Sequence, residues 1–145
     1  MISSRTFLGG ALFAAAFAIA GCGMMPKSNT TSATNQMSAA QEVPPNSSAG
    51  SGTVVTSLNK DTRLLRWTVT YSGMSGPVTA GHFHGPAAAG ANAGVVVPFA
   101  GPLASPIVGQ ATLTPAQVDQ LKQGLWYVNL HTAANPGGEL RGQVK

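Results

Sequence analysis

Glycine and proline interrupt the sequence roughly every eight to twelve residues from residue 37 onward. This spacing is expected of an all-β sandwich or barrel that is built from short strands. Segment 63–72 shows the alternation of a half-buried strand, because Leu65, Trp67 and Val69 fall on one face and polar side chains fall on the other. The sequence therefore predicts an all-β fold.

The other segments between the glycines and prolines have the length of strands. A hairpin is expected where the turn-prone residues 60–62 separate two of them. The expected strands cover residues 37–43, 52–59, 63–72, 78–85, 94–99, 107–113, 125–132 and 139–145. One short helix is expected within 113–124, with Thr114 as N-cap, Pro115 at its first position, Gly124 as terminator, and Val118 and Leu121 facing the sheet.

The N-terminal residues resemble a bacterial lipoprotein signal. Arg5 precedes an apolar run over 7–21 that has signal-peptide length and is short for a membrane-spanning helix. The run ends in small residues before Cys22, the only cysteine of the chain. The resemblance implies cleavage before Cys22 and lipid attachment to it. An ordinary secretory signal with a chance cysteine, or with a buried free thiol, is the alternative.

These features divide the chain into three parts. Residues 1–21 are expected to be the signal peptide, 22–36 the lipidated cysteine with a flexible Ser-, Thr- and Asn-rich tether, and 37–145 one β-domain. The expected location is the bacterial cell envelope, on the outer membrane or the cell surface if the cell is Gram-negative. The expected partners are a membrane at Cys22, a metal ion, and an envelope or extracellular protein.

The charged residues do not predict a nucleic-acid partner. Without Arg5 the chain carries seven Lys and Arg side chains against four Asp and Glu. The basic residues are scattered along the sequence, whereas a nucleic-acid surface needs them clustered on one face. We therefore expect no nucleic-acid binding.

All three histidines fall in two of the predicted strands. Alternation places His82 and His84 opposite Phe83, and it places His131 opposite Leu130, so all three rings are expected off the hydrophobic core. A His-x-His pair has Cα atoms about 7 Å apart, which lets two nitrogens converge on one ion at about 2.0–2.1 Å. With a third ring from another strand, the set suits copper by preference and zinc as an alternative.

Two other roles for the histidines remain open at this point. They can serve as surface hydrogen-bonding groups, with His84 bound to the loop 85–94, or one can act as a catalytic base. The small residues of that loop are expected to leave space beside the rings. No catalytic residue is expected, because the sequence has no G-x-S-x-G motif and too few carboxylates for paired acid–base catalysis.

The domain resembles the chordin-type (CHRD) domain family. The matching segments follow in the family's order and cover residues 41–53, 81–99, 113–132 and 135–144. The resemblance implies an extracellular Greek-key β-sandwich of the immunoglobulin-like or superoxide-dismutase-like kind. In chordin such domains accompany modules that capture growth factors, so a protein-binding or adhesion module with structural histidines is one alternative function.

The His-x-His strand is also loosely similar to the copper strand of Cu/Zn superoxide dismutases. The chain departs from that pattern because it lacks a bridging histidine and the zinc-ligating aspartate, and its single cysteine permits no internal disulfide. A dismutase-like redox enzyme is therefore the third functional hypothesis.

Three charged side chains are predicted to serve a structural role. Glu139 and Arg141 lie two residues apart in the last predicted strand, where their side chains would share a face. Glu42 is a further possible partner for Arg141. An internal ion pair that fixes strand register is the interpretation we favour over ligand binding.

Overall fold

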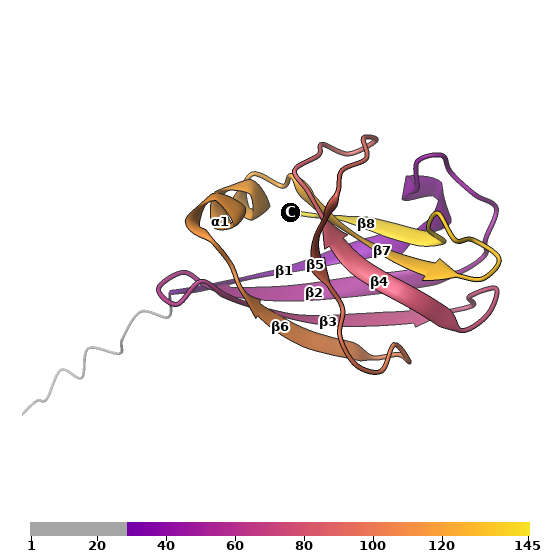
Figure 1. Ribbon diagram of the computed structural model, residues 1–145, viewed down its shortest axis with the longest axis horizontal. Coiled ribbons are helices and arrows are strands. Elements are labelled where there is room, and N and C mark those ends of the chain that lie inside the picture. The colour runs from indigo at the N-terminus through magenta and orange to yellow at the C-terminus, as the bar shows by residue number, and fades with distance from the viewer. Residues whose placement is uncertain (1–28) are drawn as a thin grey trace, which may run out of the picture.

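A single antiparallel sheet of eight strands forms the domain. The computed structural model describes residues 29–145, so the predicted signal peptide and Cys22 lie outside the described residues. The strand order is β5-β4-β7-β8-β1-β2-β3-β6 (Figure 1). The elements are β1 (Thr30–Ser38), the 3-10 helix η1 (Ala39–Gln41), β2 (Ser51–Asn59), β3 (Leu64–Ser72), β4 (Val78–His84), β5 (Val95–Pro98), β6 (Ile107–Thr112), α1 (Pro115–Lys122), β7 (Trp126–Thr132) and β8 (Leu140–Val144). The predicted all-β fold with one short helix is confirmed.

The sheet bends sharply between β8 and β1. These two strands share one paired position, Ser38 with Arg141, whereas β1 and β2 pair over nine positions from Thr30 to Ser38. The bend brings β4, β5, β7 and β8 over β1, β2, β3 and β6, so that the sheet is nearly barrel-shaped and encloses the core (Figure 1).

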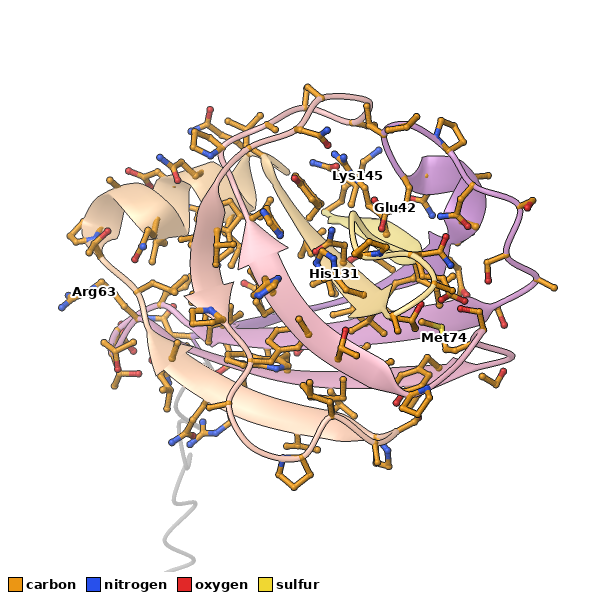
Figure 2. All side chains as sticks on the ribbon, turned by 45° about the vertical axis from the view of Figure 1, so that its right-hand side comes forward. Glu42, Arg63, Met74, His131 and Lys145 are labelled. Atoms are coloured by element: carbon orange, nitrogen blue, oxygen red, sulfur yellow. The ribbon has the colours of Figure 1, made fainter. Side chains whose placement is uncertain are left out.

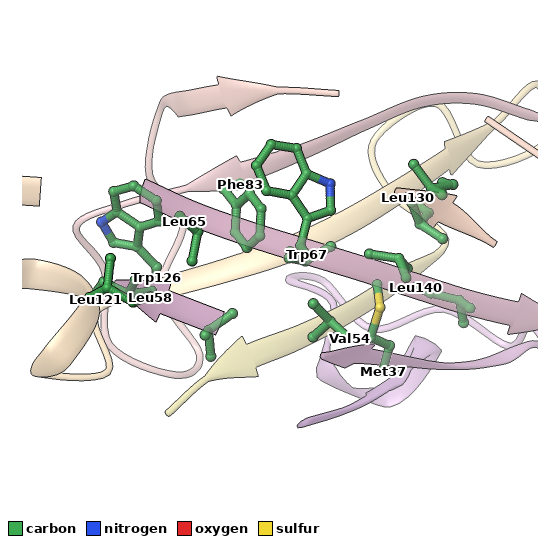
Figure 3. Packing of buried hydrophobic residues seen from close by; sticks show 14 of the residues in the cluster. Met37, Val54, Leu58, Leu65, Trp67, Phe83, Leu121, Trp126, Leu130 and Leu140 are labelled. Atoms are coloured by element: carbon green, nitrogen blue, oxygen red, sulfur yellow. The ribbon is translucent and has the colours of Figure 1, made fainter. Parts of the chain in front are cut away.

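Aromatic side chains from both halves of the sheet meet in the core. The Trp67 ring of β3 lies 5.1 Å from Phe83 of β4, measured between ring centroids (Figure 3). Its centroid is 5.3 Å from that of Phe99. Phe83 also approaches Trp126, at 5.9 Å. Gly109 of β6 makes room for Trp67, because a Cβ atom there would lie 2.3 Å from the indole ring. Edge-to-face and stacked contacts of this kind add to the stabilisation that apolar burial provides.

The β-domain begins earlier than the sequence predicted. β1 starts at Thr30, so residues 30–36, which we expected in the flexible tether, form a strand. The strand expected at 37–43 ends at Ser38, where η1 follows. The sequence did not reveal this strand because β1 buries little apolar surface. Met37 is its one buried hydrophobic side chain. Main-chain pairing with β2 holds β1 in place, and a hydrophobic pattern does not reveal such pairing.

The helix follows the prediction closely. The Thr114 hydroxyl accepts from the Gln117 backbone N–H, and the Gln117 side chain accepts from the Thr114 N–H, which makes a capping box. Leu121 is buried against the core and Val118 packs beside it. Gly124 then ends the helix with a φ of +71°, a conformation that glycine adopts without strain.

A fully buried carboxylate joins three loops at one end of the sheet. Glu139, which is 0% exposed, accepts hydrogen bonds from the hydroxyls of Ser48, Ser75 and Thr132, from the Ser75 N–H and from the Asn135 amide. Burial alone raises the pKa of Glu139, but these hydrogen bonds outweigh it and bring the pKa down to about 2.

This low pKa predicts a loss of stability in acid. Because the folded-state pKa of Glu139 is about 2 and its ordinary value is 4.5, its contribution is complete above pH 4.5 and disappears as the pH falls toward 2. Glu139→Gln should lower the free energy of unfolding at pH 7 by about 3 kcal/mol. Urea titrations followed by tryptophan fluorescence measure both effects. Asp119→Asn, which removes an exposed carboxylate, is the control and should change neither. A Glu139→Gln variant as stable as the parent chain at pH 7 would contradict this role.

Candidate metal site

The pairing of β4 with β7 brings the three histidines together. In the register of these strands, His82 lies opposite Asn129, and Ala80 lies opposite His131. The His82 ring centroid is 5.4 Å from that of His84 and 5.1 Å from that of His131. One nitrogen from each ring lies within 4.8 Å of the others. The prediction that His131 stands beside the His-x-His pair is therefore confirmed (Figure 2 labels His131).

The side of the sheet that carries the rings is less exposed than the alternation implied. The rings are half-buried, and next to them Tyr127 and Arg141 are only 3% and 1% exposed. The loop 85–94 covers this side: Tyr127 exchanges hydrogen bonds with the backbone of Ala93, and Gln143 donates to the Ala87 carbonyl. The loop that we expected to leave space beside the histidines is bound to the sheet instead.

His84 has one nitrogen bound and one free. Its Nδ1 lies 3.0 Å from the Ala93 carbonyl, which can only accept, so Nδ1 carries the proton. Nε2 then holds a lone pair, and this atom is buried without a hydrogen-bond partner. The ring stacks on Tyr127 with centroids 4.8 Å apart and planes 3° apart, which fixes its orientation.

The other upstream ring, His82, also has a free buried nitrogen. Its Nδ1 has no hydrogen-bond partner. Burial lowers the pKa of His82, and the adjacent His131 and His84 rings lower it further. The ring therefore favours the neutral form, which is the form that ligates a metal.

His131 connects the site to the turn before β8. Its Nδ1 lies 3.0 Å from the Pro136 carbonyl oxygen, and its Nε2 lies 3.0 Å from the side-chain oxygen Oδ1 of Asn129. Burial lowers the pKa of His131, the bond to Pro136 raises it, and His84 lowers it again, so that the net shift is downward. A neutral ring can donate to only one of these two oxygens, so with the proton on Nδ1 the Asn129 amide would turn its NH₂ group toward Nε2, and an ion bound at Nε2 would displace it.

Three nitrogens in this arrangement match part of a metal coordination sphere. A tetrahedral ion with nitrogens at about 2.0–2.1 Å separates them by about 3.4 Å. The nitrogens of the three rings, within 4.8 Å of one another, need to draw together by up to about 1.4 Å, which side-chain rotations provide. The backbone carbonyls of Ala93 and Pro136 hold the opposite nitrogens, as carbonyl groups commonly do behind metal-bound histidines.

Sequence reasoning missed two residues of the site. Asn129, 4% exposed, contacts His131, and Tyr127 supports His84. Both precede His131 by an even number of residues in the same strand, so alternation already placed them on its side of the sheet. That signal was available, but nothing in the sequence says that the loop 85–94 buries them.

The family comparison agrees with the order of motifs along the chain. The model of the CHRD domain matches residues 33–144. The chain belongs to the CHRD domain family. Neither a curated protein nor a solved structure matches the chain. The match begins three residues after the start of β1 and so includes most of the strand that the sequence prediction placed in the tether.

The predicted ion pair between Glu139 and Arg141 does not form in this CHRD domain. Glu139 precedes β8, which starts at Leu140, so strand alternation does not apply to it, and hydroxyl groups surround its carboxylate. Arg141 instead donates to the Asn92 side chain and to the Ala91 carbonyl, at 3.0 and 2.7 Å. Its guanidinium carbon also lies 3.5 Å from the centroid of the Tyr127 ring.

Glu42 remains near Arg141 without binding it directly. Burial raises the pKa of Glu42 to about 7, against the charge of Arg141 and the Val43 N–H, which both lower it. Its Oε1 is buried and has no hydrogen-bond partner. The carboxylate occupies the space beside Gly138, where a Cβ atom would lie 2.5 Å from Oε1 and where φ is +130°. Only glycine fits this position without strain.

The raised pKa predicts that Glu42 costs stability at alkaline pH. A group whose pKa rises from 4.5 to about 7 on folding favours the folded state below pH 4.5, and that advantage is lost as the pH rises through 7. At pH 8.5 the free energy of unfolding of Glu42→Gln should therefore exceed that of the parent chain by about 1–3 kcal/mol, as measured by urea titration, and the gain should shrink at pH 5. Asp119→Asn is again the matched control. A Glu42→Gln variant that loses stability equally at both pH values would show that the carboxylate is needed as an anion.

Proposed function

We propose that the protein is a lipid-anchored envelope protein whose CHRD domain binds one transition-metal ion, with copper preferred, through His82, His84 and His131. The observation that carries the proposal is the convergence of three imidazole nitrogens within 4.8 Å. Two further atoms support it, since His82 Nδ1 and His84 Nε2 are buried polar atoms without a partner. Buried polar atoms are normally paired, and a bound ion would pair both.

A purely structural role for the histidines explains less of the geometry. It accounts for the bonds from His84 to Ala93 and from His131 to Pro136. It does not account for the second nitrogen of His84 or for Nδ1 of His82, which are buried at a cost without a partner. A metal site uses both sets of atoms, because the carbonyl fixes the tautomer and the opposite nitrogen ligates.

The donor set favours copper over the other divalent metals. Imidazole suits copper, zinc, iron and nickel, and the Irving–Williams order places Cu(II) highest where supply does not decide. Zinc is the alternative. The three rings leave at least one coordination position for water, an exchanging ligand or a side chain such as Asn129. Storage, handover or scavenging of the ion fits such a site, and no nucleophile or acid–base pair beside it calls for an enzyme.

Metal titration tests the proposal. The chain from residue 22 with Cys22→Ala, titrated with Cu(II) and with Zn(II) by calorimetry, should bind one equivalent, more tightly for Cu(II). The double variant His82→Ala, His84→Ala should weaken Cu(II) binding by at least about a hundredfold, because two of three ligands are lost. Thr70→Ala, an exposed substitution on β3, is the control and should bind as the parent does. Equal Cu(II) affinity of the parent chain and the double variant would contradict the proposal that these histidines bind the ion.

The lipid anchor is proposed from Cys22 and the residues before it. Within residues 29–145 no helix is both long enough and apolar enough to cross a membrane. Since one acyl chain binds a membrane only marginally and two or more bind it firmly, an acylated Cys22 would hold the domain on the bilayer.

Fractionation of bacterial cells that express the full chain tests this anchor. Cys22→Ala should move the protein from the membrane fraction to the soluble fraction, while the tryptophan fluorescence of the domain stays unchanged. The matched control is Thr70→Ala, which should stay in the membrane fraction. A Cys22→Ala chain that remains in the membrane fraction would contradict acylation as the anchor.

A further inference from the structure

A hollow with an apolar floor and a basic rim lies where β1 begins. It has a volume of about 230 Å³ and is bounded by β1, β2, α1 and the end of β8. Leu58, Leu121 and Val144 contribute apolar surface. Three lysines line it as well, namely Lys60, Lys122 and Lys145. The fold thus brings together three lysine side chains that are far apart in the sequence. The sequence alone had shown only scattered basic residues.

The charge at this end of the molecule is only partly neutralised. All three lysines are exposed, and they make up three of the five exposed basic side chains within residues 29–145. Of the four acidic side chains in that range, Glu42 and Glu139 are buried elsewhere. Asp61, which follows Lys60, and Asp119, on the same helix as Lys122, are exposed at this end and offset part of the charge. Asp61 accepts a hydrogen bond from Asn29, but no salt bridge engages the lysines among the described residues. The rim therefore presents a net positive charge to the solvent.

The position of the hollow relates it to the proposed anchor. Thr31 and Ser32, the second and third residues of β1, also line it. Figure 1 shows α1, the start of β1 and the turn between β2 and β3 at one end of the domain. The eight residues from Cys22 to Thr30 can span at most about 29 Å when fully extended. If Cys22 is acylated, as proposed above, the hollow is always held near lipid headgroups.

We propose that this basic end docks on the anionic lipids of the membrane to which the chain is anchored. The three ammonium groups lie against lipid phosphates, and the apolar floor covers the upper part of one lipid. Each lysine near an anionic surface is expected to strengthen binding about fivefold. An acyl anchor together with a basic patch binds a membrane far more firmly than either does alone. The docked domain keeps α1 toward the bilayer.

Vesicle sedimentation tests the docking without the anchor. The chain from residue 22 with Cys22→Ser contains every described residue and carries no lipid. It should bind vesicles of phosphatidylglycerol and phosphatidylcholine in equal parts, more weakly as salt rises, and should not bind phosphatidylcholine alone. Lys122→Glu should reduce binding at least about fivefold. Arg66→Glu, the same charge change at an exposed position of β3 outside the hollow, should reduce it much less.

Each other outcome would overturn the docking surface. Equal losses for Lys122→Glu and Arg66→Glu would show that net charge, and not the hollow, drives binding. Binding to dispersed decanoate but not to vesicles would assign the hollow to a free anionic amphiphile, and binding to duplex DNA but not to vesicles would assign it to a nucleic acid. Because acylation plays no part in this assay, its result stands apart from the fractionation of Cys22→Ala.

Discussion

The antiparallel pairing of β4 with β7 is the constraint on which the rest of the site depends. It sets His82 opposite Asn129 and His84 opposite Tyr127, and so it decides which side chains share one side of the sheet. A shift of one residue in this register would send the rings into the core and Phe83 out of it. The aromatic contacts of Phe83 with Trp67 and Trp126 resist such a shift. Core packing on one side of these strands therefore fixes the geometry of the histidines on the other.

The side that carries the histidines behaves as a second, polar interior. Arg141 contacts Tyr127 on β7, Tyr127 stacks with His84 on β4, and the loop 85–94 closes over this array. Most polar groups on this side of the sheet are hydrogen-bonded to backbone carbonyls. Such hydrogen bonds fix the orientation of a side chain more strictly than apolar contacts do. The atoms left unbound belong to two of the histidines, to Glu42 and to Gln143, with Trp67 Nε1 a further one in the core. Two of these unbound atoms are imidazole nitrogens of adjacent rings, which suits a site that receives an ion.

The two buried carboxylates show how strongly local partners decide the state of a charge. Glu139 receives hydrogen bonds from three hydroxyl groups, which favour the anion and give a pKa of about 2. Glu42 has few donors, so burial dominates and its pKa rises to about 7. Both lie near the turn before β8, yet they act on stability in opposite pH ranges.

Much of the fold was readable from the sequence because alternation and turn residues are local signals. They gave the β2–β3 hairpin, the helix with its Thr114 cap, and the side of the strand on which each histidine lies. They did not give the start of β1, which long-range pairing holds, or the partners of Glu139, which come from three separate loops. The clustering of Lys60, Lys122 and Lys145 was hidden for the same reason, since it depends on how distant segments pack.

The most direct test of the account is electron paramagnetic resonance of the chain loaded with one equivalent of Cu(II). If the three rings share one ion, the spectrum should show a single copper species with hyperfine coupling to imidazole nitrogens. Replacing His82, His84 or His131 by alanine, one at a time, should change that species in each case. A spectrum that all three substitutions leave unaltered would mean that copper binds elsewhere and that the histidines do not form a metal site.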